Sequence, residues 1–242
     1  MLKKIMTYSE AIEKVLLDNN YFAPLKKIYR EINKYRPLTG KTPFNTIQER
    51  VQRDPRFTKI GLGVYALTEY LNQLPRVPDA KTKQEKENRV HFSVIGMLLE
   101  IGNTEGYETY SPNKNAIFEN KTLSSLMTVD SCPEFTFQQL IGRIKFIDVL
   151  WFNDRAFPKF AFEVQTTPQF RDIFVKYADL VDFYTTFYTI SRLEYKHKYE
   201  RELSRPIFKE IRKRCFFKSF EQVDNLYLKS LEKAKISAEF FA

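Results

Sequence analysis

The sequence has little cysteine, histidine and glycine, and these shortages exclude several kinds of site. Among 242 residues there are two cysteines, two histidines and seven glycines. Cys132 and Cys215 lie far apart without a CxxC pair, so we expect neither a disulfide framework nor a zinc site. Neither GxxxxGK[ST] nor GxGxxG occurs, which argues against ATP or nicotinamide chemistry. We interpret His91 and His197 as ordinary helix or surface residues, because no Ser or Cys nucleophile lies at a recognisable spacing from either.

Long apolar runs are also missing. The first 17 residues, MLKKIMTYSEAIEKVLL, alternate charged and apolar positions at helical spacing. They lack the continuous apolar stretch that a signal peptide or a membrane span needs. With 43% hydrophobic and 29% charged residues, the chain has enough apolar material for a core. We therefore expect a globular, cytoplasmic protein that makes no membrane contact.

Positive charge is present in excess and is concentrated near the N-terminus. The net charge is +9, and residues 1–70 hold 13 Lys and Arg against 7 Asp and Glu. The first 70 residues thus carry an excess of six positive charges, and the other 172 carry an excess of three. A concentrated positive field attracts nucleic acid, although the same charge is also typical of a well-hydrated surface.

Residues 1–72 have the pattern of three helices followed by a β-hairpin. Thr7 to Glu10 reads as a capping box, after which apolar residues follow at helical spacing. Pro24 favours the start of a second helix, and Thr42 with Pro43 favours a third. Residues 56–60 and 62–67 read as two short strands. This order predicts a winged helix-turn-helix, and the prolines near 75–78 predict a linker over 73–80 before a second domain, 81–242.

The third helix is the predicted DNA-reading element. Phe44, Ile47 and Val51 are expected to point inward, which leaves a polar, amide-rich face outside. Asn and Gln can read adenine edges in the major groove, and the hairpin can contact phosphate, although winged helices also bind proteins. The candidate DNA-binding residues are Lys41, Asn45, Thr46, Gln48, Gln52, Arg53 and Lys59, with Arg171 from the second domain.

The second domain reads as a mixed β-sheet flanked by helices, an α+β or α/β class. A charged helix is predicted from Lys81 to a capping Gly102, with Glu100 on its last turn. Residues 111–136 give no periodic signal. Strands are predicted at 107–110, 146–152, 159–165, 183–190 and 215–217, and helices from Thr167–Pro168, over 193–214 and from Ser219.

Two carboxylates interrupt apolar strands. Asp148 lies in the run FIDVLWF, and Glu163 lies in the neighbouring run FAFEVQ. A buried carboxylate costs several kcal/mol unless it is paired, protonated or bound to a metal. Glu163 and Gln165 share one strand face, and a hairpin partner brings Asp148 beside them. Mg²⁺ prefers such oxygen ligands, so Asp148 and Glu163 are the candidate metal ligands, with Mn²⁺ as a substitute.

Two resemblances cover most of the chain. The runs YSEAIEKVL and TPFNTIQERVQRDPRFTKIGLGVYAL resemble the HARE-HTH winged-helix domain over residues 5–70. Asp148, followed after 15 positions by Glu163-x-Gln165, resembles the PD-(D/E)XK nuclease motif, with Gln in place of the usual Lys. The block IDVLWFNDRAFPKFAFEVQTTPQFRDIFVKYADL and the later RPIF resemble a bacterial HARE-HTH nuclease family over residues 90–230.

The resemblances imply a Mg²⁺-dependent type II restriction-like endonuclease that cuts double-stranded DNA. Asp148, Glu163 and Gln165 would be catalytic. Glu100 either joins them from its helix or lies on a solvated helix surface. A homodimer and a cognate DNA methyltransferase are the expected partners. The alternatives are a DNA-binding regulator with an inactive nuclease-like core, which Gln165 favours, and a repair or RNA-processing nuclease.

Overall fold

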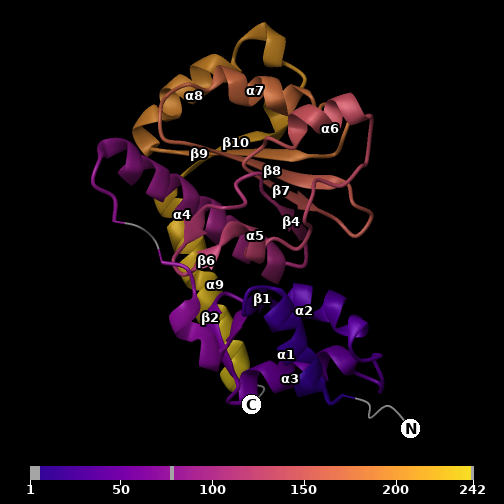
Figure 1. Ribbon diagram of the computed structural model, residues 1–242. Coiled ribbons are helices and arrows are strands. Elements are labelled where there is room, and N and C mark those ends of the chain that lie inside the picture. Colours follow the sequence, from indigo (N-terminus) through magenta and orange to yellow (C-terminus); the bar gives the residue numbers. More distant parts are fainter. Residues whose placement is uncertain (1–5, 77–78, 241–242) are drawn as a thin grey trace.

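A three-helix bundle with a small sheet forms the N-terminal part of the computed structural model, which describes residues 6–76 and 79–240 (Figure 1). The helices are α1 (Tyr8–Asp18), α2 (Leu25–Glu31) and α3 (Pro43–Arg53), and the strands are β1 (Phe22–Pro24), β2 (Phe57–Gly61) and β3 (Val64–Leu67). The strand order is β1-β3-β2, all antiparallel. Two 3₁₀ helices, η1 (Ile32–Lys34) and η2 (Thr68–Gln73), follow α2 and β3. The predicted winged-helix order of elements is confirmed, with β1 as an additional strand.

Local signals set the ends of these helices. Thr7 Oγ accepts from Glu10 N at 3.2 Å and Glu10 Oε2 accepts from Thr7 N at 2.6 Å, so the predicted capping box is present. Pro24 does not open α2 as predicted, because it pairs with Val64 at the end of β1. Phe44 was expected to point inward but is 47% exposed, and its ring lies 4.9 Å from that of Tyr29.

A five-stranded mixed sheet is the centre of the rest of the chain. Its order is β10-β9-β8-β7-β4, with β8, β9 and β10 parallel and with β7 antiparallel to both β8 and β4. The strands are β4 (Glu108–Tyr110), β7 (Val149–Phe152), β8 (Pro158–Gln165), β9 (Thr186–Ser191) and β10 (Cys215–Ser219). A small hairpin of β5 (Ile117–Phe118) and β6 (Lys121–Thr122) lies in the stretch that gave no sequence signal.

Helices cover both faces of this sheet, so the predicted mixed sheet flanked by helices is confirmed (Figure 1). One group comprises α6 (Gln138–Ile144), α7 (Arg171–Ala178) and α8 (Lys196–Leu203); the other comprises α4 (Lys83–Thr104), α5 (Leu123–Leu126) and α9 (Phe220–Phe240). Three 3₁₀ helices, η3 (Leu193–Tyr195), η4 (Pro206–Phe208) and η5 (Arg212–Arg214), flank α8 and precede β10. Of these helices, none in the described residues is both long and apolar enough to cross a membrane.

Several predicted boundaries in this part are wrong for identifiable reasons. Gly102 does not end α4: a Cβ there would lie 2.6 Å from the Trp151 ring, so the glycine permits close packing, and Gly106 has the positive φ of +89° after the helix. Residues 166–170 form a loop, so α7 starts at Arg171 and not at Pro168. The predicted helix over 193–214 breaks before Pro206, whose ring cannot continue it.

A buried polar cluster joins the β2–β3 turn to the second part of the chain. Glu100 and Lys121 are both fully buried, with Lys121 Nζ 3.1 Å from Glu100 Oε1. Glu100 Oε2 accepts from Leu62 N and from the Tyr227 hydroxyl, each at 2.7 Å, and Lys121 donates to Ile60 O at 3.0 Å. We call this cluster the buried clasp; it consists of the side chains of Glu100, Lys121 and Tyr227 and the main chain of the turn at Ile60–Leu62.

The basic helix α2 also contacts the second part of the chain. Lys26 Nζ lies 3.2 Å from Glu108 and donates to Gly106 O at 2.6 Å, and Arg30 lies 3.3 Å from the same glutamate. Lys27, 6% exposed, lies 3.6 Å from Asp130. Part of the N-terminal positive excess therefore faces acidic groups of this same chain. The division into domains at 73–80 stays a prediction, and its residues 77–78 lie outside the described residues.

The buried clasp gives a first prediction. Lys121→Met leaves the Glu100 carboxyl without its cation. We therefore expect the free energy of unfolding, measured in urea, to fall by about 3 kcal/mol. In the double variant Glu100→Gln/Lys121→Met no buried charge is left unpaired, and it should lose less stability than the single variant. If the stability losses of the two single variants add, so that the double variant is the least stable, Glu100 and Lys121 do not act as a pair.

Candidate active site

Three of the predicted site residues meet at the carboxyl end of β8. Glu163 and Gln165 are the sixth and eighth residues of this strand, and Val149 at the start of β7 pairs with Phe162. Asp148, directly before β7, therefore lies across from Glu163. Because β8 and β9 are parallel, this edge also holds the end of β9, where Ser191 pairs with Gln165. Ligands of open sheets with parallel strands bind beyond such carboxyl ends.

Glu163 is the most buried carboxylate of this group. It is 5% exposed, and Lys176 Nζ on α7 lies 2.7 Å from its Oε1. Burial raises the pKa of Glu163 well above its usual range, and the nearby Asp148 carboxylate raises it further, against the lowering effect of Lys176. An added positive charge beside this pair of carboxylates would therefore be favourable.

Asp148 differs from its predicted place inside a strand. It lies in a bend before β7, and its side chain is 13% exposed. Its Oδ2 accepts from Val164 N at 2.9 Å, and His91 Nε2 on α4 lies 3.5 Å from its Oδ1. The main-chain donor of β8 thus fixes the orientation of this carboxylate, which keeps some contact with solvent.

Lys176 of α7 supplies a cation at the carboxyl end of β8. Its Nζ reaches Glu163 and also Phe146 O, at 3.2 Å, so it bridges the segment before β7 and the end of β8. Gln165 contacts the loop that leads to α7, because its Nε2 donates to Gln169 O at 2.7 Å.

Glu100 is not part of this group, which corrects both expectations for it. It is fully buried in the clasp, so it is not on a solvated surface. On α4 it is nine residues from His91, the residue of that helix that contacts Asp148, which is about 13 Å along the helix axis. Burial raises the pKa of Glu100, whereas Lys121 and Tyr227 lower it.

Most of the predicted DNA-binding residues are on the surface. On and beside α3 the side chains of Lys41, Asn45, Gln48, Gln52 and Arg53 are exposed, and Thr46 is half-buried with its hydroxyl donating to Thr42 O. Lys59 on β2 and Arg171 at the start of α7 are also exposed. The tip of the hairpin, however, is enclosed: a Cβ on Gly61 would lie 2.5 Å from Glu100 Oε1.

The donor set at the end of β8 suits a hard divalent cation. Within residues 6–76 and 79–240 no three His, Cys, Asp or Glu side chains are grouped to hold a metal by themselves. Mg²⁺ in proteins is often held by one or two carboxylates with water and substrate phosphate as the other ligands, so two carboxylates suffice. The raised pKa of Glu163 beside Asp148 fits such a role, because a bound cation would offset burial and mutual repulsion.

The comparison with protein families decides the class of this chain. Residues 73–241 match the model of the type II restriction enzyme NmeDI C-terminal domain. The chain belongs to this family. Its mixed sheet flanked by helices is compatible with a restriction-endonuclease-like fold, and the family implies DNA as substrate. No curated protein and no solved structure matched the chain.

Two residues of the site in this restriction-enzyme domain were not identified from the sequence. Lys176 was not among the candidate site residues, although it is the first lysine after Gln165 in the sequence. His91 was interpreted as an ordinary helix residue. It lies 57 positions from Asp148, and no local pattern links the two, so only the packing of α4 against β7 and β8 reveals it.

Lys176 gives the second prediction. If its ammonium stabilises charge on the phosphate during cleavage, Lys176→Met should slow single-turnover DNA cleavage by about 10² to 10³. Lys176→Arg should keep part of the rate, and DNA affinity should change little. Lys159→Met, an exposed position at the opposite end of β8, is the control. Loss of melting temperature without a selective loss of cleavage would mean that Lys176 only neutralises Glu163.

Proposed function

We propose that the protein is a Mg²⁺-dependent type II restriction endonuclease that hydrolyses phosphodiester bonds of double-stranded DNA at a specific sequence. The observation that carries the proposal is the meeting of Asp148, Glu163 and Lys176 at the carboxyl end of β8, with the lysine 2.7 Å from the glutamate. Two carboxylates and a lysine are the side chains that the PD-(D/E)XK motif brings together. The family match to a restriction enzyme domain supports the same reaction class.

Each side chain has a distinct role in this proposal. Asp148, oriented by Val164 N, and Glu163 would hold Mg²⁺ or Mn²⁺. The ion, when bound, supplies a polarised phosphoryl oxygen and a more acidic water. Lys176 would stabilise the negative charge that develops on the phosphate. The Gln165 amide is neither a general acid nor a general base. It would therefore orient the attacking water or act as a ligand through its amide oxygen, while its Nε2 donates to Gln169 O.

The N-terminal part would position the enzyme on DNA. Residues 5–70 resemble the HARE-HTH domain in sequence, and α3 presents exposed amide side chains at Asn45, Gln48 and Gln52. These side chains have the chemistry to read adenine edges in the major groove. Cutting both strands requires two active sites or two successive cuts, which favours a homodimer. A cognate DNA methyltransferase would protect the host DNA.

The third prediction tests the reaction itself. Purified protein with Mg²⁺ should cut phage DNA into discrete fragments, and Asp148→Asn or Glu163→Gln should abolish cutting without weakening DNA binding, because both residues are proposed to hold the metal. Asp154→Asn, in the exposed turn between β7 and β8, is the matched control. Gel electrophoresis of the products and a binding titration provide the two measurements.

The outcomes of that assay separate the alternatives. Random degradation of DNA or cleavage of RNA would favour a repair or RNA-processing nuclease. Tight DNA binding with no cleavage in Mg²⁺ or Mn²⁺, and no stabilisation by either metal, would favour a DNA-binding regulator and refute the nuclease.

The fourth prediction concerns base reading by α3. Gln48→Ala or Asn45→Ala should reduce the preference for the specific sequence by about 1 to 3 kcal/mol if either side chain contacts a base edge. Lys59→Ala on β2 should weaken binding to all sequences alike if it contacts phosphate. Competition between specific and unrelated duplexes measures the difference. Equal losses for all three variants would place α3 on the phosphate backbone or away from DNA.

A further inference from the structure

A cavity of about 290 Å³ lies beyond the same sheet edge and is not explained by the reaction chemistry. One wall is the loop and first turn of α7, residues 168–172, which follow β8. The other wall is formed by Lys198, Arg201 and Glu202 of α8, which follows β9. The cavity therefore lies between the segments that leave the carboxyl ends of two neighbouring parallel strands, the usual place for ligands in such sheets.

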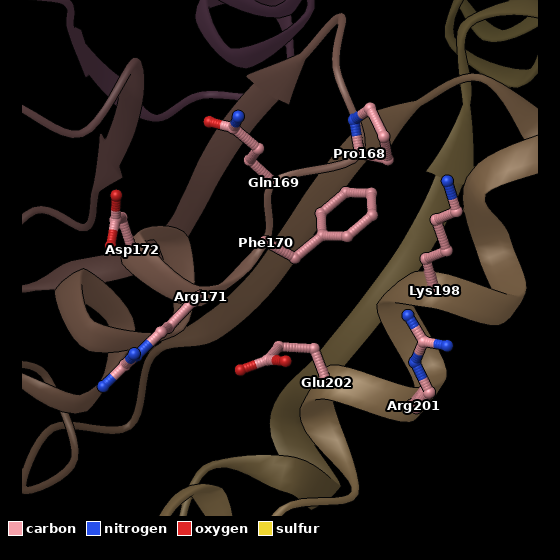
Figure 2. Close-up of a pocket in the computed structure, with 8 residues that line it drawn as sticks. All are labelled: Pro168, Gln169, Phe170, Arg171, Asp172, Lys198, Arg201 and Glu202. Carbon is pink, nitrogen blue, oxygen red and sulfur yellow. The ribbon is translucent and has the colours of Figure 1, made fainter.

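Aromatic packing fixes these two walls against each other. Phe170, 3% exposed, packs edge-on against Tyr199 of α8 with ring centroids 5.7 Å apart, and Phe174 of α7 packs against the same tyrosine at 5.2 Å. Figure 2 shows the Phe170 ring facing α8. Because both contacts are buried, the spacing between the loop and α8 is set by the core.

The lining of the cavity includes three cations, Arg171, Lys198 and Arg201, against two carboxylates, Asp172 and Glu202. In Figure 2 the side chains of Lys198 and Arg201 extend from α8 in the same direction, while Arg171 points away from α8 on the other side of the loop. No carboxylate of the described residues lies within 4.0 Å of these three cations. Glu202 is paired with Arg205 at 2.7 Å, outside the cavity lining, whereas Asp172 lies on the α7 side of the cavity. The segment 192–214 as a whole carries nine Lys and Arg against four Glu.

The cavity is also coupled to the catalytic edge. Gln165 Nε2 holds Gln169 O of the cavity wall at 2.7 Å. On α7, Lys176 follows Arg171 by five residues, about 7.5 Å along the helix axis.

We propose that Lys198 and Arg201 bind a backbone phosphate of the DNA strand that is cut, a short distance from the scissile phosphate. This inference rests on the proposed nuclease function. The two cations meet the phosphate from α8, and the loop held by Gln165 forms the opposite wall. The cavity positions the strand for Asp148, Glu163 and Lys176 without reading its sequence, so it serves every DNA sequence alike.

The test uses the full chain, a duplex without a recognition site, and EDTA, so that binding is measured without cleavage. Lys198→Ala/Arg201→Ala should bind about tenfold more weakly, and its plot of log affinity against log salt should be less steep by about 1, the value for one lost phosphate contact. Lys196→Ala/Lys209→Ala removes the same charge from exposed positions outside the cavity and should change affinity less than about twofold. The exchange variant Lys198→Arg/Arg201→Lys should restore most of the affinity.

Parallel measurements separate this proposal from the proposed function. Unfolding of Lys198→Ala/Arg201→Ala should occur at the wild-type temperature; if it does not, Arg201→Gln at its exposed position gives the same test. Equal affinity and salt slope in the cavity variant and its control would overturn the phosphate contact, as would a wild-type protein that does not bind DNA. Stabilisation by inorganic phosphate that requires Lys198 and Arg201, with DNA binding unchanged, would overturn it in favour of a small-anion pocket. Wild-type protein that binds through these residues but never cuts with Mg²⁺ would support the contact and refute the nuclease.

Discussion

The buried pairing of Glu100 with Lys121 is the interaction on which the arrangement of the two parts of the chain depends. Two charged side chains without solvent contact are costly unless each is fully engaged. In the clasp, Glu100 accepts hydrogen bonds from Leu62 N and from Tyr227 of α9. Lys121 of the β5–β6 hairpin donates to Ile60 O, so both charged side chains also bind the turn between β2 and β3. A shift of the β2–β3 hairpin relative to α4 would break the hydrogen bonds from Leu62 N to Glu100 and from Lys121 to Ile60 O, and a buried polar group that loses its partner is costly, so these bonds hold the hairpin against the second part of the chain.

The clasp also changes how the N-terminal part can meet DNA. The hairpin tip of a winged helix commonly contacts phosphate, but here Gly61 and Leu62 pack against Glu100 inside the molecule. The basic residues of α2 face Glu108 and Asp130. In the N-terminal part, the exposed face of α3 and the side of β2 that carries Lys59 are therefore the surfaces available for the proposed DNA contact.

The loop after β8 determines what surrounds the two carboxylates at the sheet edge. Gln165, two residues after Glu163 on β8, holds the loop before α7, and Lys176 reaches Glu163 from the helix that the loop introduces. The same loop is a wall of the cavity beside α8, so one turn of chain after β8 links the proposed metal-binding carboxylates, the ammonium and the proposed phosphate contact.

The sequence by itself determined the elements whose signals are local. The capping box at Thr7, the helix start at Ser219, the alternation along β8 and the carboxylates at 148 and 163 follow from neighbouring residues, and the structure has each of them near its predicted place. Only the tertiary structure decided what joins these elements across long distances in sequence. His91 beside Asp148 and the partners of Glu100 depend on how α4, α7 and α9 pack on the sheet, because contacts between distant segments leave no periodic pattern in the chain.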